Sequence, residues 1–480
     1  MIALKLRRID PFRIEIEKAP PMRTTGLIYA NHAIERTLEH DNVLQQVANV
    51  ATLPGIIGPS LAMPDIHWGY GFPIGGVAAF SKKDGIISPG GVGYDINCGV
   101  CCLLTGLRLD EVKPSLDKLL SSLFNNVPSG VGSSNKDLAV GNKEFSSVLE
   151  NGVRWAVKKG YAPHDDLDAH EDGGCIEGAD PDAVSKKAIE RGQPQLGTLG
   201  SGNHFLELDV VERVLENKTA DHFGIFEGQV VIQVHTGSRG LGHQVCDDYV
   251  HEMLAAASRH RISLPDRQLV CAPVTSKEGM EYFTAMASAA NFAFANRELI
   301  VFLIRETFEH VFGGSFERLG MRMLYDCCHN IAKMERVMWE GSEVAVCIHR
   351  KGATRALPPG DKRLPQRFRK CGQPVLVPGD MGRASFIMVG AQGASETFYS
   401  ACHGAGRLLS RHEAKKRSKG RQILEELRRK DIHAMAASRA TLAEEIPEAY
   451  KDVSDVVDTM TGADIAKAVA RLKPFAMVKG

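Results

Sequence analysis

The sequence predicts a mixed α/β (α+β) protein with one large catalytic body. Short apolar runs separated by Gly and Pro fill residues 53–107, which is typical of strands joined by tight loops. Longer stretches with helical periodicity, at about 243–260 and 280–312, alternate with further short apolar runs. The 480 residues exceed the roughly 250–300 at which single cores stop growing. Length alone therefore favours two or three domains, or one large body with insertions.

The first half of the chain is expected to begin with strands and to become helical after the Gly-rich region. The first 25 residues favour a strand-bearing lead-in. Residues 164–182 are acidic and are expected to form an exposed loop. The expected helices lie at about 31–51, which is amphipathic, 113–126 and 143–159.

The second half alternates between the two kinds of element. Expected strands lie near 205–211, 230–235, 321–327, 344–349, 374–377 and 386–389. Expected helices lie at about 243–260 and 280–312, and the second is rich in Ala and Phe and so is expected to be buried. From residue 407 onward the chain is expected to be mainly helical.

Composition excludes several classes of protein. Hydrophobic residues make up 44% of the chain and charged residues 24%, which is typical of a soluble globular enzyme. No run approaches the ~18–20 uninterrupted apolar residues of a membrane span, and the N-terminus lacks the apolar core of a signal peptide. The eleven cysteines are mostly isolated or adjacent, which favours reduced thiols. We therefore expect a cytoplasmic protein with no membrane partner.

Charge is segregated along a chain whose formal net charge is +0. Residues 350–370 and 407–430 are rich in Lys and Arg, whereas residues 162–184 contain Asp and Glu but neither Lys nor Arg. Such segregation can build a positive face on a neutral protein, which nucleic acid would bind. Solvated surfaces that compensate one another explain the same pattern equally well.

Four histidines lie in similar settings, beside small or Gly-rich segments at expected strand ends. They are His204 in GTLGSGNHFLEL, His235 in VIQVHTGSRGLGHQ, His329 in LYDCCHNIAK and His403 in YSACHGAGR. Each alone is more simply explained as a hydrogen-bonded structural histidine. Four in one setting, with GYDINCG as a fifth segment, favour a shared active site on loops that follow strands.

Asp95 and Cys98 in GYDINCG are three residues apart, so a tight turn can direct both side chains to one metal centre. A thiolate can bridge two cations while imidazoles complete each shell. Mixed Asp, Cys and His ligation suits Zn²⁺, Co²⁺ or Mn²⁺, and ligand softness alone favours Zn²⁺. The competing interpretation is a CxxC motif of Cys98 and Cys101, but the second CxxC of a zinc ribbon is missing.

Backbone N–H groups are exposed with little side-chain obstruction in four segments, GSGNH, HTGSRG, GDMGRAS and CHGAGR. Such loops can cradle phosphates, and Arg239 can add positive charge to one of them. None matches a P-loop or a dinucleotide fingerprint, so no standard nucleotide-binding fold follows.

Eight ordered segments resemble the RtcB family of RNA-splicing ligases along essentially the whole chain. They are MPDIHWGYGFPIGG (63–76), GGVGYDINCG (90–99), LGSGNHFLE (199–207), HTGSRGLGHQ (235–244), DCCHN (326–330), HRKGATRA (349–356), GDMGRAS (379–385) and CHGAGR (402–407). The C-terminal Lys479-Gly480 also fits, and Trp68 after His67 is a local variation. The resemblance implies a single RtcB-type domain over residues 1–480, distinct from the nucleotidyltransferase ligases. It would carry a basic helical segment at about 407–432 and a helical C-terminal tail.

The resemblance also implies a role for each candidate residue. The ligands of a two-Mn²⁺ centre would be Asp95, Cys98, His204, His235 and His329, with Cys98 bridging the metals. His403 would attack the α-phosphate of GTP and carry GMP as a phosphoramidate. The GTP and GMP contacts would be Asn203, Phe205, Glu207, Gly379, Asp380, Met381, Ser385, Gly404, Ala405, Gly406, Tyr450 and Lys479. Independently of the resemblance, the basic stretches at 350–370 and 407–430 are candidate tracks for RNA phosphates, and the candidate contacts are Arg239, Arg350, Lys351 and Arg355.

The activity that the resemblance implies is the joining of RNA 3′-phosphate or 2′,3′-cyclic phosphate ends to 5′-hydroxyl ends, in tRNA splicing or RNA repair. GMP would pass from His403 to the RNA 3′-phosphate, and the 5′-hydroxyl would then displace it. The implied Mn²⁺ replaces the Zn²⁺ expected from softness, because metal availability and geometry decide occupancy. The family also suggests an archease-type activating protein as a partner.

Two other functions are compatible with the same residues. A dinuclear metallophosphoesterase would use the same ligands, but it has no need of a covalent GMP on His403. A non-catalytic RNA-binding scaffold would have no chemical reason to keep Cys98 and His403.

Overall fold

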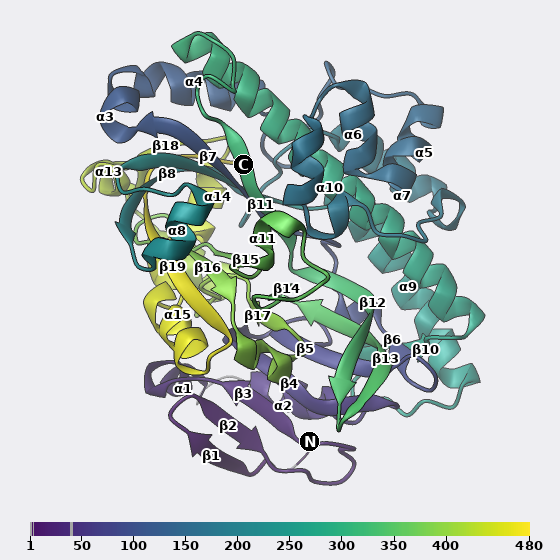
Figure 1. Ribbon diagram of the computed structural model, residues 1–480. Helices are drawn as coiled ribbons and strands as arrows, with labels where there is room; N and C mark the ends of the chain where they lie inside the picture. The colour runs from purple at the N-terminus through teal and green to yellow at the C-terminus, as the bar shows by residue number, and fades with distance from the viewer. Residues whose placement is uncertain (1, 3, 39–41) are drawn as a thin grey trace.

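The computed structural model describes residue 2, residues 4–38 and residues 42–480, and it confirms a mixed α/β fold. A 7-stranded sheet contains the N-terminal strands, which lie at the bottom of Figure 1. Its order is β1 (Leu6–Asp10), β2 (Arg13–Ile16), β3 (Gly26–Tyr29), β4 (Ile56–His67), β5 (Ile74–Ser81), β13 (Ser342–Lys351) and β12 (Asn330–Trp339).

An 8-stranded sheet forms the other large layer. Its order is β11 (Arg322–Cys328), β7 (Gly99–Arg108), β9 (Gln229–Thr236), β8 (Phe205–Val214), β19 (Ala466–Lys479), β16 (Ser385–Gly390) and β15 (Pro374–Val377), with β18 (His433–Ala436) beside β19. Two short pairs complete the strands, β6 (Ile86–Ile87) with β10 (Ala272–Pro273) and β14 (Ala353–Arg355) with β17 (Ser400–Cys402).

The strand ends that carry the candidate site residues lie side by side along one edge of the 8-stranded sheet, where its strands begin or end. Gly99 at the start of β7 pairs with Thr236 at the end of β9 and with Cys328 at the end of β11. Phe205 at the start of β8 pairs with His235 of β9 and with Lys479 at the end of β19. Residues that are far apart in sequence are therefore neighbours along this edge.

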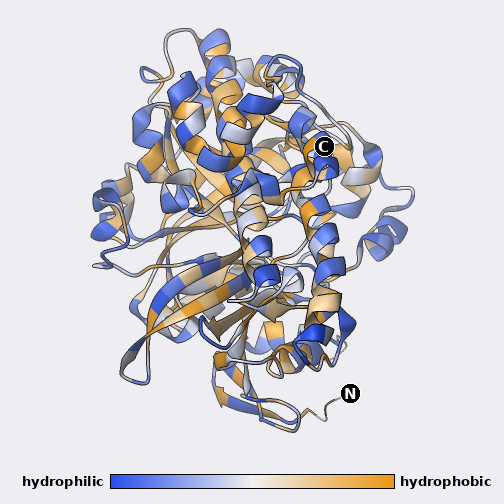
Figure 2. Ribbon diagram, turned by 90° about the vertical axis from the view of Figure 1, so that its right-hand side faces the viewer, coloured by the Kyte–Doolittle hydropathy of each residue, from blue (hydrophilic) through white to orange (hydrophobic). Residues whose placement is uncertain are grey.

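The α-helices lie outside and between the sheets (Figure 1). They are α1 (His32–Leu38), α2 (Val43–Val50), α3 (Leu109–Val112), α4 (Leu116–Asn126), α5 (Asn142–Asn151), α6 (Val153–Lys159), α7 (Lys186–Gly192), α8 (Asn217–Phe223), α9 (Arg239–Arg259), α10 (Lys277–Phe312), α11 (Gln366–Arg369), α12 (Arg411–Ser418), α13 (Ile423–Arg428), α14 (Arg439–Glu444) and α15 (Val453–Gly462). Figure 2 shows hydrophilic and hydrophobic residues alternating along the outer helices and strands, as expected when one side faces a core.

Helix α10 is the long buried helix that the sequence predicts. It is the single helix in the described ranges that is long and apolar enough to cross a membrane, but 89% of its apolar 18-residue window is buried inside the protein. Its side chains pack against α5, α6 and α9 and against strand β9. It is therefore a core helix, and it packs against the 8-stranded sheet through strand β9.

Two expected helices are divided. The region expected to be one helix over 31–51 contains α1 and α2, and residues 39–41 between them lie outside the described residues. The region 143–159 contains α5 and α6, which are separated at Gly152. Gly152 has a φ of +51°, and a Cβ there would lie 2.2 Å from the backbone oxygen of Gly174. A helix cannot continue through this conformation, so the sequence-based helix ends there.

The expectation of an exposed acidic loop at 164–182 is wrong for its central part. Asp166, His170 and Glu171 are buried, with exposed fractions of 4%, 1% and 1%. Arg305 of α10 pairs with Asp166 at 2.7 Å, and Lys333 of β12 pairs with Glu171. The compensating charges come from distant segments, which a local charge pattern cannot reveal.

The expectation of a helical C-terminal tail is wrong at its end. Helices α12 to α15 lie in the tail, but its last element is β19, which pairs with β8 on one side and β16 on the other. The Ala-rich composition of residues 466–479 favours a helix. Pro474 opposes one because it lacks an N–H, and it lies where the pairing of β19 with β8 shifts register. Pairing on both sides decides the conformation of this segment.

Candidate active site

A cavity of about 1050 Å³ opens beside the strand edge described above. Its wall includes most of the residues that the sequence singled out. These are Asp95, Cys98, Asn203, His204, Phe205, Glu207, His235, Arg239, His329, Lys351, Gly379, Asp380, Met381, His403, Gly404, Ala405, Gly406, Tyr450 and Lys479.

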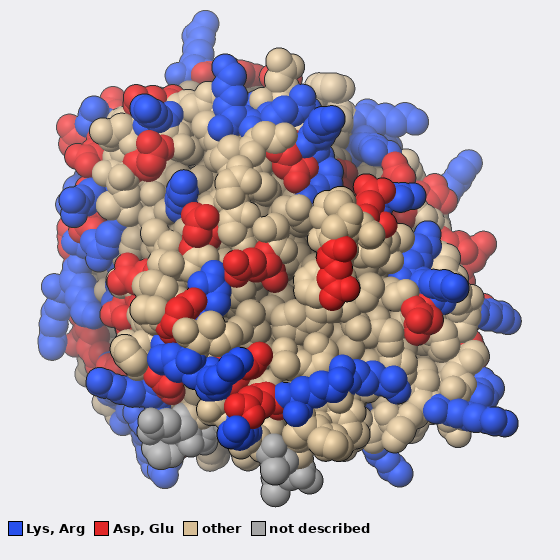
Figure 3. Space-filling model, turned by 60° about the horizontal axis from the view of Figure 1, so that its bottom comes forward, with Lys and Arg blue, Asp and Glu red and all other residues tan. Residues whose placement is uncertain are grey.

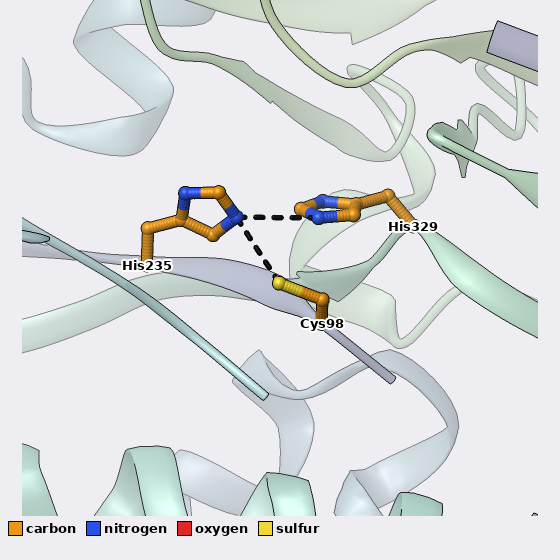
Figure 4. A group of neighbouring side chains, drawn as sticks. All are labelled: Cys98, His235 and His329. Carbon is orange, nitrogen blue, oxygen red and sulfur yellow. Dashed lines mark hydrogen bonds between the residues drawn. The ribbon is translucent and has the colours of Figure 1, made fainter. Parts of the chain in front are cut away.

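One group of candidate metal ligands lines this cavity, and Figure 4 shows its side chains, Cys98, His235 and His329, facing one another. Cys98 Sγ is 3.3 Å from His235 Nε2, and His235 Nε2 is 3.3 Å from His329 Nε2. Cys98 precedes β7, His235 is near the end of β9 and His329 follows β11. The order of strands in the sheet therefore brings the three side chains together.

A second group shares the same thiol. Asp95 Oδ2 lies 2.9 Å from His204 Nε2, and Cys98 Sγ lies 3.5 Å from that nitrogen. The ligand atoms within each group all lie within 4.8 Å of one another. A cysteine common to two such groups is the arrangement that a thiolate bridging two cations requires.

The electrostatics of the two groups fit divalent cations. Burial, reinforced by neighbouring histidines, holds the pKa of His235 and of His329 well below the usual value, so both rings are neutral and offer lone pairs. Burial and the nearby Asp95 carboxylate raise the pKa of the Cys98 thiol well above its usual value. Burial opposes ionisation of Asp95, but the hydrogen bond and charge of His204 outweigh it and lower the pKa of this carboxyl. Two neutral imidazole nitrogens 3.3 Å apart repel one another unless a proton or a cation lies between them.

His403 lies beside the first group and has a carboxylate partner. It follows β17, and its ring centroid is 4.7 Å from that of His329. Asp65 Oδ2, on β4, lies 2.5 Å from His403 Nδ1 and accepts the backbone N–H of His403 at 2.9 Å. The Asp65 side chain is fully buried. A base or nucleophile whose ring is oriented by a buried carboxylate is a recurring catalytic arrangement.

The far wall of the cavity combines aromatic and charged side chains. Lys479 Nζ lies 5.5 Å from the centre of the Phe205 ring, and Tyr450 donates a hydrogen bond to Glu445. Burial and the nearby Asp209 raise the pKa of Glu207 well above its usual value. Ser385 does not line the cavity, but its Oγ accepts the backbone N–H of Gly379 at 3.1 Å and so holds the loop that does.

The expectation that Arg350 and Arg355 lie along an exposed RNA track is wrong. Arg350 has an exposed fraction of 0% and is paired with Glu335. Arg355 is also buried and is paired with Asp172 at 2.7 Å. Both guanidinium groups are occupied by carboxylates, that of Arg350 by Glu335 on the neighbouring strand β12 and that of Arg355 by Asp172, so neither is available to a phosphate.

The other basic candidates have different positions. Lys351 and Arg239 line the cavity. Burial lowers the pKa of Lys351 to about 7, and its ammonium donates to the backbone oxygens of Tyr70 and Gly90. On the face drawn in Figure 3, basic and acidic side chains of the described residues are interspersed, so this is not the positive face that charge segregation predicts.

Three residues of the site were not singled out as candidates from the sequence: His67 and Arg407 line the cavity, and Asp65 bonds His403 from outside its wall. Asp65 and His67 belong to the segment MPDIH, which carries the family resemblance, but that segment gave no role for them. Burial lowers the pKa of His67 to about 3. Arg407 closes the segment CHGAGR and donates to Glu445 at 3.0 Å and to the Tyr450 hydroxyl at 3.2 Å. Membership of these motifs was the signal that could have identified Asp65, His67 and Arg407.

The fold and the site define a mixed α/β protein with two adjoining groups of candidate metal ligands that share a cysteine. A family model described as tRNA-splicing ligase RtcB matches residues 46–480, and the chain belongs to this family. The resemblance found in the sequence is therefore confirmed.

Full-length relatives support the same assignment. The chain is 51% identical over 478 residues to a protein of Archaeoglobus fulgidus named tRNA-splicing ligase RtcB, with 99% of each chain covered. It is 52% identical over 477 residues to the protein of the same name from Thermococcus kodakarensis, again with 99% of each covered. It is 47% identical over 437 residues to the RNA-splicing ligase RtcB of Mycobacterium tuberculosis, covering 91% of this chain and 100% of the relative.

Proposed function

We propose that this protein is a GTP- and Mn²⁺-dependent RNA ligase that joins 2′,3′-cyclic phosphate or 3′-phosphate ends to 5′-hydroxyl ends. The observation that carries the proposal is the Asp65–His403 pair beside two ligand groups that share Cys98. The names of the relatives support RNA joining as the overall reaction. The RNA would be tRNA halves or broken transcripts in the cytoplasm, and an archease-type protein would activate the enzyme.

The proposed metal ligands are the five side chains of the two groups. Cys98, His235 and His329 would hold one Mn²⁺, and Asp95, Cys98 and His204 would hold the other. When bound, the two ions would neutralise the negative charge of phosphate oxygens near His403. Asp95 supplies the hard oxygen donor and the histidines supply neutral nitrogen, a mixed set that suits Mn²⁺.

His403 is the proposed nucleophile. Its Nδ1 is engaged by Asp65, which leaves Nε2 for attack on the α-phosphorus of GTP. Attack forms a nitrogen–phosphorus bond and breaks the bond to the leaving pyrophosphate. The Asp65 carboxylate accepts the Nδ1–H hydrogen bond and so stabilises the positive charge that develops on the ring.

The nucleotide would be oriented by the far wall of the cavity. The Glu207 carboxyl can hydrogen bond to a guanine edge, while Phe205 and Tyr450 offer aromatic faces. Lys479 adds positive charge near the same place. Phosphates would contact Asn203 and the backbone N–H groups of two cavity loops, Gly379–Asp380–Met381, held by Ser385, and Gly404–Ala405–Gly406.

A cyclic 2′,3′-phosphate is first opened by water, which attacks the phosphorus and breaks its bond to the 2′-oxygen, leaving a 3′-phosphate. The next step uses the same histidine. An oxygen of the RNA 3′-phosphate attacks the phosphorus on His403, breaks the nitrogen–phosphorus bond and takes GMP. The 5′-hydroxyl then attacks the RNA phosphorus, forms the phosphodiester and releases GMP. Arg239 and Lys351 line the cavity and are proposed to contact the RNA phosphates.

A sealing assay tests this proposal. One RNA would end in a 2′,3′-cyclic phosphate and its partner would begin with a 5′-hydroxyl. With GTP and Mn²⁺ we expect a joined product, and we expect none when GTP is omitted. Hydrolysis of the cyclic phosphate without joining would favour the dinuclear phosphoesterase, which the same ligand groups would also support.

A further inference from the structure

Arg297 is fully buried in α10, behind the cysteine that the two ligand groups share. Its exposed fraction is 0%. Its Nη1 donates to the backbone oxygen of Asn97 at 2.8 Å, and its Nη2 donates to Asn97 Oδ1 at 3.1 Å. Asn97 has a φ of +51° and directly precedes Cys98. The two bonds therefore hold an uncommon backbone conformation next to the thiol.

The same guanidinium reaches two other segments that carry ligands. Nη1 also donates to the backbone oxygen of Thr236 at 3.0 Å, one residue after His235. Nε lies 3.0 and 2.8 Å from the two carboxylate oxygens of Asp326. Asp326 is on β11, three residues before His329. One side chain thus contacts the segments of three ligands.

The absence of a side chain at Gly99 leaves room for the Arg297 guanidinium. It begins β7, between the ends of β9 and β11. A Cβ at Gly99 would lie 3.0 Å from Arg297 Cζ and 2.4 Å from the backbone oxygen of Cys327. A larger residue at this position would displace the guanidinium or separate the strands.

We propose that Arg297 is a positioning residue of the metal centre, which fixes the relative places of Cys98, His235 and His329. A planar guanidinium spreads five donors over three nitrogens and can bond all three segments at once, whereas the three donors of a lysine ammonium lie on one nitrogen and cannot span the same positions. This inference rests on the metal assignment in the proposed function. Residues that orient metal ligands from behind typically change metal affinity by about 10–100-fold when replaced.

The test measures Mn²⁺ affinity by titration calorimetry and the absorption of the Co²⁺-loaded protein, which reports thiolate ligation. The variants are Arg297→Lys and, as a matched control, Arg305→Lys. Arg305 is also buried in α10 and is ion-paired, with Asp166 and Glu298, and neither partner belongs to a ligand group. Both variants lose a buried guanidinium, so both should lower the thermal midpoint.

We expect Arg297→Lys to bind Mn²⁺ about 10–100-fold more weakly and to alter the Co²⁺ spectrum, while Arg305→Lys keeps the wild-type affinity and spectrum. Wild-type values for Arg297→Lys, or equal losses in both variants, would overturn the inference. Wild-type protein that binds no Mn²⁺ would overturn the metal assignment and this inference together.

A milder variant covers the case in which Arg297→Lys does not fold. Asn97→Gly keeps the backbone oxygen and tolerates the positive φ, and it removes the Oδ1 contact with Nη2 together with the Nδ2 bond to the backbone oxygen of Ala290. We expect a loss of Mn²⁺ affinity in the same direction, of up to about 10-fold. An unchanged affinity in this variant would overturn the inference.

Discussion

Asp65 Oδ2 lies 2.5 Å from the ring nitrogen Nδ1 of His403 and 2.9 Å from its backbone nitrogen. A single buried oxygen thus fixes both the ring and the backbone of the histidine. The contact joins β4 to the segment after β17, across 338 positions of the chain. Because Nδ1 is bonded to Asp65, Nε2 is the ring nitrogen left to act as a nucleophile. The proposed reaction requires this nitrogen.

We predict that Asp65→Asn slows the transfer of GMP to His403 by roughly 10²–10⁴-fold. An amide can donate to Nδ1, which favours the tautomer that carries its proton on Nε2, and a protonated Nε2 cannot attack phosphorus. Single-turnover formation of the protein–GMP adduct measures the effect. Thermal unfolding should show a folded protein, and an unchanged rate in a folded variant would refute the role given to Asp65.

We predict that Cys98→Ser lowers the number of tightly bound Mn²⁺ ions from two to at most one, because the residue common to both groups is lost. Metal analysis after desalting measures the stoichiometry. Cys101→Ser is the matched control, since Cys101 is buried in β7 but belongs to neither group. Equal loss of metal in the Cys98 and Cys101 variants would support the CxxC interpretation instead.

The pH dependence of metal binding follows from the thiol. Burial and Asp95 raise the pKa of Cys98 in the metal-free protein, so a proton occupies the sulfur at neutral pH. Metal must displace this proton, and the apparent affinity should rise with pH by up to about tenfold per unit below that pKa. Calorimetry in buffers of different ionisation enthalpy should detect the released proton. An affinity that is constant between pH 6 and roughly pH 8 would contradict this account.

Arg350 is predicted to stabilise the fold and not to bind RNA. Replacing it by Ala leaves Glu335 and the backbone oxygen of Phe398 without this partner, and should lower the free energy of unfolding by about 3–5 kcal/mol. Denaturant titration measures the change. Arg336→Ala is the control, because Arg336 is 72% exposed and pairs with Glu343 at the surface, where a small effect is expected.

Much of the site could be predicted because its residues lie in local motifs. Cys98, His204 and His235 each lie beside a short apolar run and a Gly-rich turn, His329 follows a short apolar run, and such patterns identify strand ends. Their convergence depends on the strand order β11-β7-β9-β8, which no local pattern encodes. The family resemblance predicted that these side chains meet at one site.

The failures have a common physical cause. Arg350 and Arg355 form a basic run that looks exposed, but Glu335 and Asp172 neutralise them from other parts of the chain. The acidic stretch at 164–182 was misjudged for the same reason. Burial of paired charges and strand pairing of the tail are tertiary effects, whereas propensity and charge patterns are local.

The most direct test of the proposed function is covalent labelling with α-labelled GTP and Mn²⁺, followed by denaturing electrophoresis of wild type and His403→Ala. We predict an acid-labile, base-stable label on wild type and none on the variant, because the adduct is a phosphoramidate at His403. Absence of label on wild-type protein that has bound Mn²⁺ would contradict a histidine–GMP intermediate and favour hydrolysis of phosphate esters.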